Sequence, residues 1–177
     1  MRTFIALELP EAFADEIAGM ARRLALSCEG RFVSRETYHV TLAFLGEIDE
    51  AISHDAVAAL DEACAGRGPV PLRSEGLGKF GRPHDATLWL GLAATPGLTE
   101  LAASVRGCLA ARGVAFEDKP FCPHVTLGRR VRLPRADLPQ LAFPRPDRAV
   151  RATLFKSILE PEGARYKPLH TVSLTGE

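Results

Sequence analysis

His39-Val40-Thr41-Leu42 and His124-Val125-Thr126-Leu127 are two copies of one tetrapeptide, in a chain that contains five histidines in all. In a β-strand, successive side chains point to opposite faces. Each copy therefore predicts a strand that turns its valine and leucine toward a core and its histidine and threonine away from it. The polar face would carry a proton-transfer group beside a hydroxyl.

The repetition makes these polar faces candidates for chemistry. A single His-Thr face on a strand is ordinarily a solvated or hydrogen-bonded surface. Two such faces turned toward each other would form a symmetric site for general acid–base catalysis on an anion. The candidate catalytic residues are His39, Thr41, His124 and Thr126.

The similarity of the two halves extends beyond the tetrapeptide. A strand, a proline, a helix, a glycine, a phenylalanine and a histidine follow one another in both halves, with an offset of 83 to 86 residues. The matching positions are Pro10, Gly30, Phe32 and His39 in the first half and Pro96, Gly113, Phe116 and His124 in the second. This offset predicts a single domain, residues 1–177, made of two duplicated lobes related by an approximate two-fold axis.

Hydrophobic periodicity and turn residues predict the elements. Helices are expected at 11–27, 50–65 and 96–112, and strands or extended segments at 3–9, 31–33, 39–45, 70–79, 86–93, 114–116, from 124, 149–160 and 168–175. Residues 80–85 are expected to form a loop, and 132–147, with four prolines, an irregular connector with a short helical turn at 135–139. The predicted fold class is α+β: two pseudo-symmetric lobes, each an antiparallel sheet backed by helices, with a central cleft.

Composition excludes several classes of function. The apolar fraction of 46% and charged fraction of 25% are typical of a soluble globular protein. The formal net charge of zero argues against wrapping long nucleic acid, but permits recognition of one phosphate or a strand end. The chain has neither a G-x-G-x-x-G motif nor a P-loop, which removes dinucleotide enzymes and common ATPases from first consideration.

The remaining features predict a cytoplasmic protein without a bound metal. The four cysteines form no C-x-x-C pair and match no zinc spacing, so we expect buried or half-buried reduced thiols at Cys28, Cys64, Cys108 and Cys122. Two histidines with hydroxyl partners supply too few ligands for zinc. No signal segment or membrane span is expected, and nothing suggests more than a monomer.

The paired motif resembles that of the two-histidine (2H) phosphoesterase superfamily. Within it, residues 2–10, 39–47 and 124–129 look like the opening and the two motifs of RNA 2′,3′-cyclic phosphodiesterases, once called 2′-5′ RNA ligases. Ser157-Ile158-Leu159, followed by Gly163, Tyr166 and Leu169, is similar to their C-terminal hairpin.

The resemblance implies hydrolysis of a 2′,3′-cyclic phosphate at an RNA terminus, leaving a 2′-phosphate, without metal or cofactor. The partners it implies are RNA 3′ ends or nucleoside 2′,3′-cyclic phosphates, with no obligate protein partner. It assigns His39 as proton donor and His124 as acceptor, an assignment that the symmetric motif itself leaves open. It also implies that the reverse reaction can join ends in vitro.

Three further residues are candidates for substrate binding. Arg129 or Arg130 is expected to add positive charge at the phosphate; strand parity with His124 favours Arg130, whereas the resemblance favours Arg129. Alternation would place Phe44 on the apolar face, so it is either a core residue or a stacking platform for a base. Less specific candidates near the cleft are His84 in the expected loop and Lys156, Arg165 and Tyr166 in the hairpin, whereas His54 is expected to be exposed.

Alternative functions remain open from the sequence. The enzyme could act on another cyclic or 2′-5′ linked phosphate, such as ADP-ribose 1″,2″-cyclic phosphate or 2′-5′ oligoadenylate. A non-catalytic nucleotide-binding module with the same fold would bind AMP without turning over any cyclic phosphate. A metal-dependent hydrolase would lose its activity in EDTA.

Overall fold

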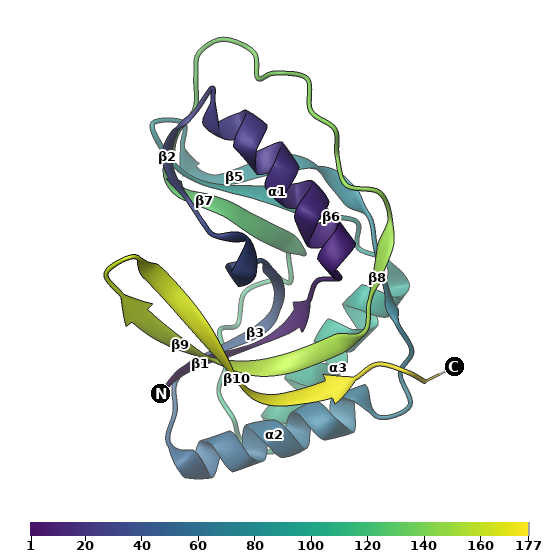
Figure 1. The fold of residues 1–177 in the computed structure, drawn as a ribbon. Helices are drawn as coiled ribbons and strands as arrows, with labels where there is room; N and C mark the ends of the chain where they lie inside the picture. The colour runs from purple at the N-terminus through teal and green to yellow at the C-terminus, as the bar shows by residue number, and fades with distance from the viewer. Residues whose placement is uncertain (177) are drawn as a thin grey trace.

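The computed structural model describes residues 1–176, whose architecture is shown in Figure 1. The first of its two main sheets, sheet A, has four antiparallel strands in the order β10-β9-β1-β3. Their bounds are Gly163–Ser173 for β10, Arg151–Glu160 for β9, Arg2–Glu8 for β1 and His39–Glu47 for β3. The first His-Val-Thr-Leu copy therefore opens the edge strand of sheet A.

The second main sheet, sheet B, has four antiparallel strands in the order β2-β7-β6-β5. Their bounds are Glu29–Phe32 for β2, His124–Arg132 for β7, Asp85–Leu92 for β6 and Ser74–Arg82 for β5. The second copy of the tetrapeptide opens β7. Two short strands, β4 (Val70–Leu72) and β8 (Asp147–Ala149), form a separate antiparallel pair.

Three α-helices cover the sheets with their apolar faces. In α1 (Glu11–Ala25), the stripe Phe13, Ile17, Met20 and Leu24 is buried. This helix packs on β2 and covers sheet B, whereas α2 (Glu50–Cys64) and α3 (Pro96–Ala111) pack together beneath sheet A (Figure 1). The apolar faces of both sheets and all three helices join in one connected core. The predicted fold class, α+β with antiparallel sheets backed by helices, is thus confirmed.

Two helices pack against a different sheet from the one that contains the strand before them. Helix α1 follows β1 of sheet A but packs against sheet B, and α3 follows β6 of sheet B but packs against β3 of sheet A. The C-terminal strands β9 and β10 return to sheet A. Each lobe is therefore built from both halves of the sequence. That the lobes arose as two copies of one unit stays a prediction.

Several local predictions were wrong. The expected strand 70–79 is interrupted at Arg73, because β4 pairs with β8 while β5 joins sheet B. The expected loop 80–85 is only the two-residue turn Pro83-His84, since β5 and β6 continue their pairing up to Arg82 and Asp85. The segment 114–116 belongs to no strand, and 135–139 forms no helical turn. Strand β10 begins at Gly163 rather than near 168, because its pairing with β9 starts directly at the hairpin turn.

Candidate active site

A β-bulge in β3 decides which side chains face the site. Thr41 pairs with Ala6 of β1 and Ala43 pairs with the next residue, Ile5, so that Leu42 has no partner. One extra residue reverses the alternation downstream. Phe44, which pairs with Phe4, is thereby turned from the expected apolar face to the face that carries Thr41.

Strand β7 has the same bulge at the matching position. Thr126 pairs with Trp89 and Gly128 with Leu88, which leaves Leu127 without a partner. Arg129 then lies on the face of His124 and Thr126. A second irregularity follows at once, where Arg130 adopts the left-handed conformation with φ 52°. Parity counted along an uninterrupted strand therefore assigns the two arginines to the wrong faces.

Both motif strands contribute to one cleft of about 910 Å³. Six of the seven candidate site residues line it: His39, Thr41, Phe44, His124, Thr126 and Arg129. The seventh, Arg130, is not among the residues that line the cleft, because it is the extra residue of the second irregularity and is exposed. The expected convergence of two distant histidines on one cleft is thus present in the structure.

The two imidazoles are oriented in the same way by the backbone. Nδ1 of His39 lies 2.7 Å from the carbonyl oxygen of Thr37, and Nδ1 of His124 lies 2.6 Å from that of Cys122. A carbonyl oxygen can only accept, so Nδ1 must carry the proton in both rings. Each neutral imidazole therefore has its lone pair on Nε2, the nitrogen available for proton transfer.

His39 is enclosed by aromatic rings. Its ring centroid lies 4.7 Å from that of Phe4 and 5.3 Å from that of Tyr166. Burial lowers the pKa of His39 from 6.5 to about 4; the Thr37 carbonyl opposes this shift, and the positive charges of His124 and Arg129 add to it. His39 is therefore neutral at pH 7 in the unliganded protein. In that state its Nε2, 2.9 Å from the Thr41 Oγ1, accepts a hydrogen bond from this hydroxyl.

His124 is held by aromatic rings of sheet B. The Phe80 ring meets the imidazole edge-on at a centroid distance of 5.3 Å, and the Trp89 ring lies 5.6 Å away. Gly78 makes room for Trp89, because a Cβ at this position would overlap the indole ring. The absence of a side chain at position 78 thus allows the Trp89 ring to pack beside His124.

Sequence reasoning missed several residues of the cleft and misplaced others. Tyr166 lines it as expected, whereas Lys156 and Arg165 are not among its lining residues. His84 is exposed in the tight turn, and His54 is exposed as expected.

Other cleft residues were not predicted. Sequence reasoning missed Phe80, because residues 80–85 are predicted to form a loop and Phe80 in fact lies in β5. Cys122 also lines the cleft and is exposed rather than buried, because it lies in the irregular segment before β7. The further lining residues that sequence reasoning missed include Arg2, Phe4, Thr87, Arg106, Lys119 and Phe121.

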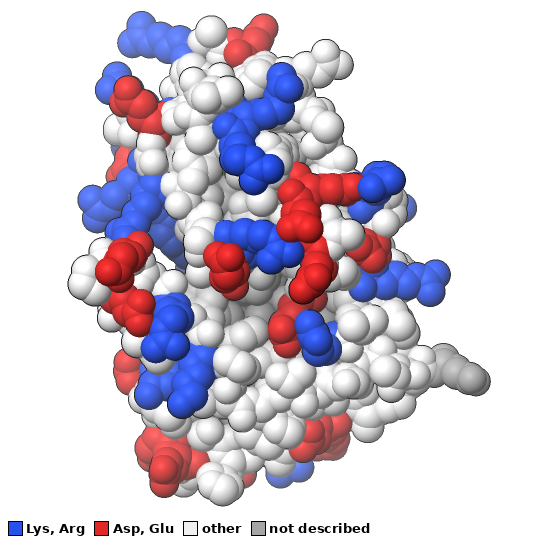
Figure 2. All heavy atoms as spheres, in the orientation of Figure 1, with Lys and Arg blue, Asp and Glu red and all other residues white. Residues whose placement is uncertain are grey.

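The cleft is cationic although the whole chain is neutral. Among residues 1–176, its lining includes the cations Arg2, Arg106, Lys119 and Arg129 but a single carboxylate, Glu117. On the face drawn in Figure 2, by contrast, basic and acidic side chains are interspersed. This local excess of positive charge suits an anionic ligand.

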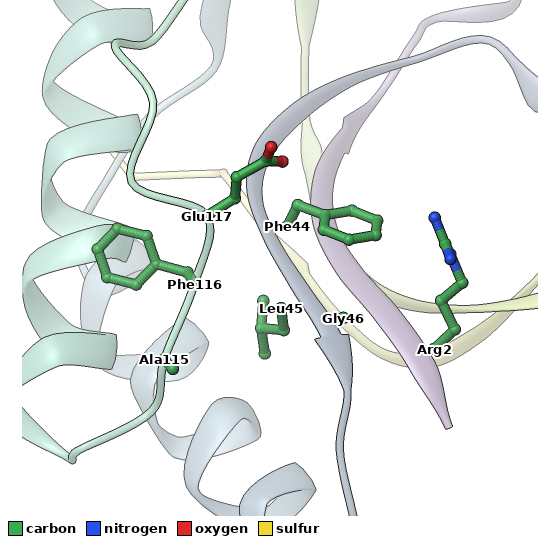
Figure 3. Close-up of a pocket in the computed structure, with 7 residues that line it drawn as sticks. All are labelled: Arg2, Phe44, Leu45, Gly46, Ala115, Phe116 and Glu117. Carbon is green, nitrogen blue, oxygen red and sulfur yellow. The ribbon is translucent and has the colours of Figure 1, made fainter.

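Phe44 lies where the cleft meets a second, shallower pocket of about 580 Å³. Figure 3 shows its ring between the side chains of Glu117 and Arg2. The Arg2 guanidinium lies over the ring, 5.1 Å from its centroid, and the Glu117 amide donates to the Phe44 carbonyl at 2.8 Å. The ring is half-buried, which leaves part of it accessible from the cleft.

Two negative findings apply to residues 1–176. No three His, Cys, Asp or Glu side chains lie close enough together to hold a metal ion. No helix in this range has the length and apolar character needed to cross a membrane.

Sequence comparisons assign a family. The model of the 2′-5′ RNA ligase superfamily matches residues 9–156. The RNA 2′,3′-cyclic phosphodiesterase of Thermotoga maritima is 32% identical over 99% of this chain and 97% of its own length. The protein of the same name from Escherichia coli is also 32% identical, over 98% of this chain and 97% of its own.

Solved structures agree with this assignment. TT0787 of Thermus thermophilus superposes with a TM-score of 0.84 at 28% identity, covering 100% of both chains. LigT of Escherichia coli complexed with 3′-AMP superposes with a TM-score of 0.81 at 28% identity, covering 98% of both chains. With the fold, the paired motifs and nearly full-length relatives in agreement, the chain belongs to the 2′-5′ RNA ligase superfamily.

Proposed function

We propose that this chain is an RNA 2′,3′-cyclic phosphodiesterase that hydrolyses the terminal cyclic phosphate to a 2′-phosphate by paired-histidine acid–base catalysis. The observation that carries the proposal is the matched orientation of the two imidazoles. Both are bound through Nδ1 to a backbone carbonyl and line the same cationic cleft. The names of the relatives from Thermotoga maritima and Escherichia coli support this choice of substrate.

The reaction assigns one task to each imidazole. Nε2 of the neutral imidazole removes a proton from water, whose oxygen forms a new bond to phosphorus. The bond from phosphorus to O3′ breaks, and Nε2–H of the protonated imidazole delivers its proton to O3′. The product is a 2′-phosphate with a free 3′-hydroxyl, and each such proton transfer typically contributes about 10²–10⁴ in rate.

The low pKa of His39 can be reconciled with its proposed role as the acid. An anionic cyclic phosphate brought beside the ring raises this pKa, because an opposite charge favours the protonated form. We propose that His39 takes up a proton as substrate binds and that His124 then serves as the base. Once His39 is protonated, Thr41 no longer donates to Nε2, and its hydroxyl is free to turn toward the phosphate.

The remaining cleft residues supply the donors that the reaction needs. We propose that the Thr41 and Thr126 hydroxyls and the Arg129 guanidinium stabilise the charge that develops on the non-bridging phosphate oxygens. Phe44 provides a ring on which the terminal base stacks. Since side chains fill the tasks of base, acid and oxyanion donor, we propose that the reaction requires no metal.

The decisive experiment uses an oligonucleotide that ends in a 2′,3′-cyclic phosphate, incubated with the protein in EDTA. Phosphorus NMR should show a 2′-phosphate product. His39→Ala and His124→Ala should each lower the rate at least about 100-fold. His54→Ala, which removes an exposed histidine outside the cleft, should leave the rate unchanged. A 3′-phosphate product, activity only with added metal, or full activity of either cleft variant would contradict the proposal.

A further inference from the structure

Arg106 of α3 connects strand β3 to the irregular segment between α3 and β7, and both contribute residues to the cleft. Its Nε donates to the carbonyl oxygen of Leu42 at 3.1 Å, and its Nη1 donates to that of Lys119 at 2.6 Å. The guanidinium also lies 5.7 Å from the centroid of Phe116 and 5.9 Å from that of Phe121. Arg106 thus uses its donors on the backbone, without a carboxylate partner among these contacts.

The Leu42 carbonyl belongs to the bulge that turns Phe44 into the cleft. The matching bulge carbonyl in the other lobe, that of Leu127, accepts from the backbone amide of Val33 at 2.9 Å. This amide comes from the residue after β2, which covers the outer edge of β7. Within the described part of the chain, residues 1–176, β3 is the last strand at this edge of sheet A. The Arg106 side chain therefore satisfies, in one lobe, the carbonyl that a backbone amide satisfies in the other.

The Lys119 carbonyl belongs to the irregular segment that leads to the second motif. Three residues later, the carbonyl of Cys122 fixes the tautomer and direction of the His124 ring. Glu117, two residues before Lys119, also joins this segment to β3, because its amide donates to the Phe44 carbonyl. One rigid guanidinium thus ties the strand of His39 to the segment that orients His124.

We propose that Arg106 is a positioning residue that holds the two catalytic imidazoles in register across the cleft. The inference rests on the proposed function for its catalytic consequence. A planar guanidinium can donate to two carbonyls in different directions, whereas the single ammonium of lysine is a compact charge on a flexible stem. Lysine would therefore keep the charge at 106 without keeping the geometry.

The kinetic test compares Arg106→Lys and Arg106→Met on a nucleoside 2′,3′-cyclic phosphate. Both variants should lower kcat about 10- to 100-fold, because small misplacements of reacting groups are costly, while KM changes less than about threefold. If Arg106 instead held substrate by its charge, lysine would restore most of the activity and methionine would raise KM. Arg112→Met, which removes an arginine of a surface ion pair at the end of α3, is the matched control and should retain full activity.

A second measurement decides the inference without any turnover. Hydrogen exchange in Arg106→Met should accelerate at the Glu117 amide, which donates to the Phe44 carbonyl, while the Val33 amide in the other lobe keeps its protection. Unchanged protection of the Glu117 amide would overturn the positioning role. If the wild-type protein failed to turn over any cyclic phosphate, the proposed function would fall, while the exchange data would still decide whether Arg106 orders this segment.

Discussion

The pKa of His39 links a single side chain to the stability of the protein. Burial against Phe4 and Tyr166 lowers this pKa from 6.5 to about 4. Between these two pH values the unfolded chain binds the proton and the folded chain does not. The stability that comes with the neutral ring is therefore complete above pH 6.5 and is lost as the pH falls toward 4.

His39→Gln should remove this pH dependence. Between pH 7 and pH 5, the wild-type protein should lose about 1–2 kcal/mol more unfolding free energy than the variant, because the apolar surroundings of the half-buried imidazole oppose its protonation. Urea unfolding at the two pH values measures the difference. His54→Gln, at an exposed histidine, should behave like the wild type. Equal pH slopes for wild type and His39→Gln would show that the imidazole is not desolvated in solution.

At this scale, alternation along the motif predicted much of the site. Val40, Leu42, Val125 and Leu127 are fully buried and the motif histidines and threonines line the cleft, as a period of two requires. The aromatic residues around the imidazoles could not be assigned in this way. Phe4 and Trp89 lie in strands, where the sequence does not distinguish a core ring from one that packs on a catalytic histidine.

At the scale of elements, the bulges in β3 and β7 explain why simple alternation placed Phe44 and Arg129 on the wrong faces of their strands. Both occur at a leucine followed by a small residue, Leu42-Ala43 and Leu127-Gly128. Gly128 has little room for a side chain, since a Cβ would lie 2.8 Å from Cγ2 of Val131. A bulge depends on the register between two strands, so neither strand predicts it alone. For this reason strand parity favoured Arg130 as the arginine that faces the cleft, whereas the resemblance to a family favoured Arg129, the one that lines it.

Gly30→Ala tests the second irregularity of β7. Gly30 has φ 151°, and a Cβ there would lie 2.6 Å from the Cα of Val131. The substitution should lower the unfolding free energy by about 1–3 kcal/mol through backbone strain and overlap. It should also reduce turnover, because the strand segment that it displaces carries Arg129.

The control for this substitution is Gly107→Ala in α3. A Cβ at Gly107 would meet nothing within 4 Å, so alanine should stabilise the helix by about 0.5–1 kcal/mol. Thermal and urea unfolding of both variants give the comparison. Equal stability of Gly30→Ala and the wild type would mean that β2 and β7 can relax around the new methyl group.

At the scale of the molecule, the stability of each lobe depends on a helix that follows a strand of the other lobe. Helix α1 leaves sheet A to cover sheet B, and α3 does the reverse. The sequence predicted the three helices, but two duplicated lobes would keep each helix with the strands of its own half. Periodicity shows that a helix has an apolar face and does not say which sheet receives it.

This connectivity predicts that the two lobes unfold together. Trp89, the single tryptophan of the chain, reports on sheet B through its fluorescence, while far-UV circular dichroism reports on all elements. The two urea transitions should coincide with one midpoint, because the core is continuous across both lobes. A fluorescence midpoint clearly separated from that of circular dichroism would indicate lobes of independent stability.

The bonds that orient the two imidazoles end on main-chain oxygens, those of Thr37 and Cys122. Every amino acid provides such an oxygen, so the alignment of the rings places no demand on which side chains occupy these two positions. Natural variation or protein engineering can thus replace the exposed thiol at 122 with a residue that resists oxidation and still retain the same proton on the same nitrogen.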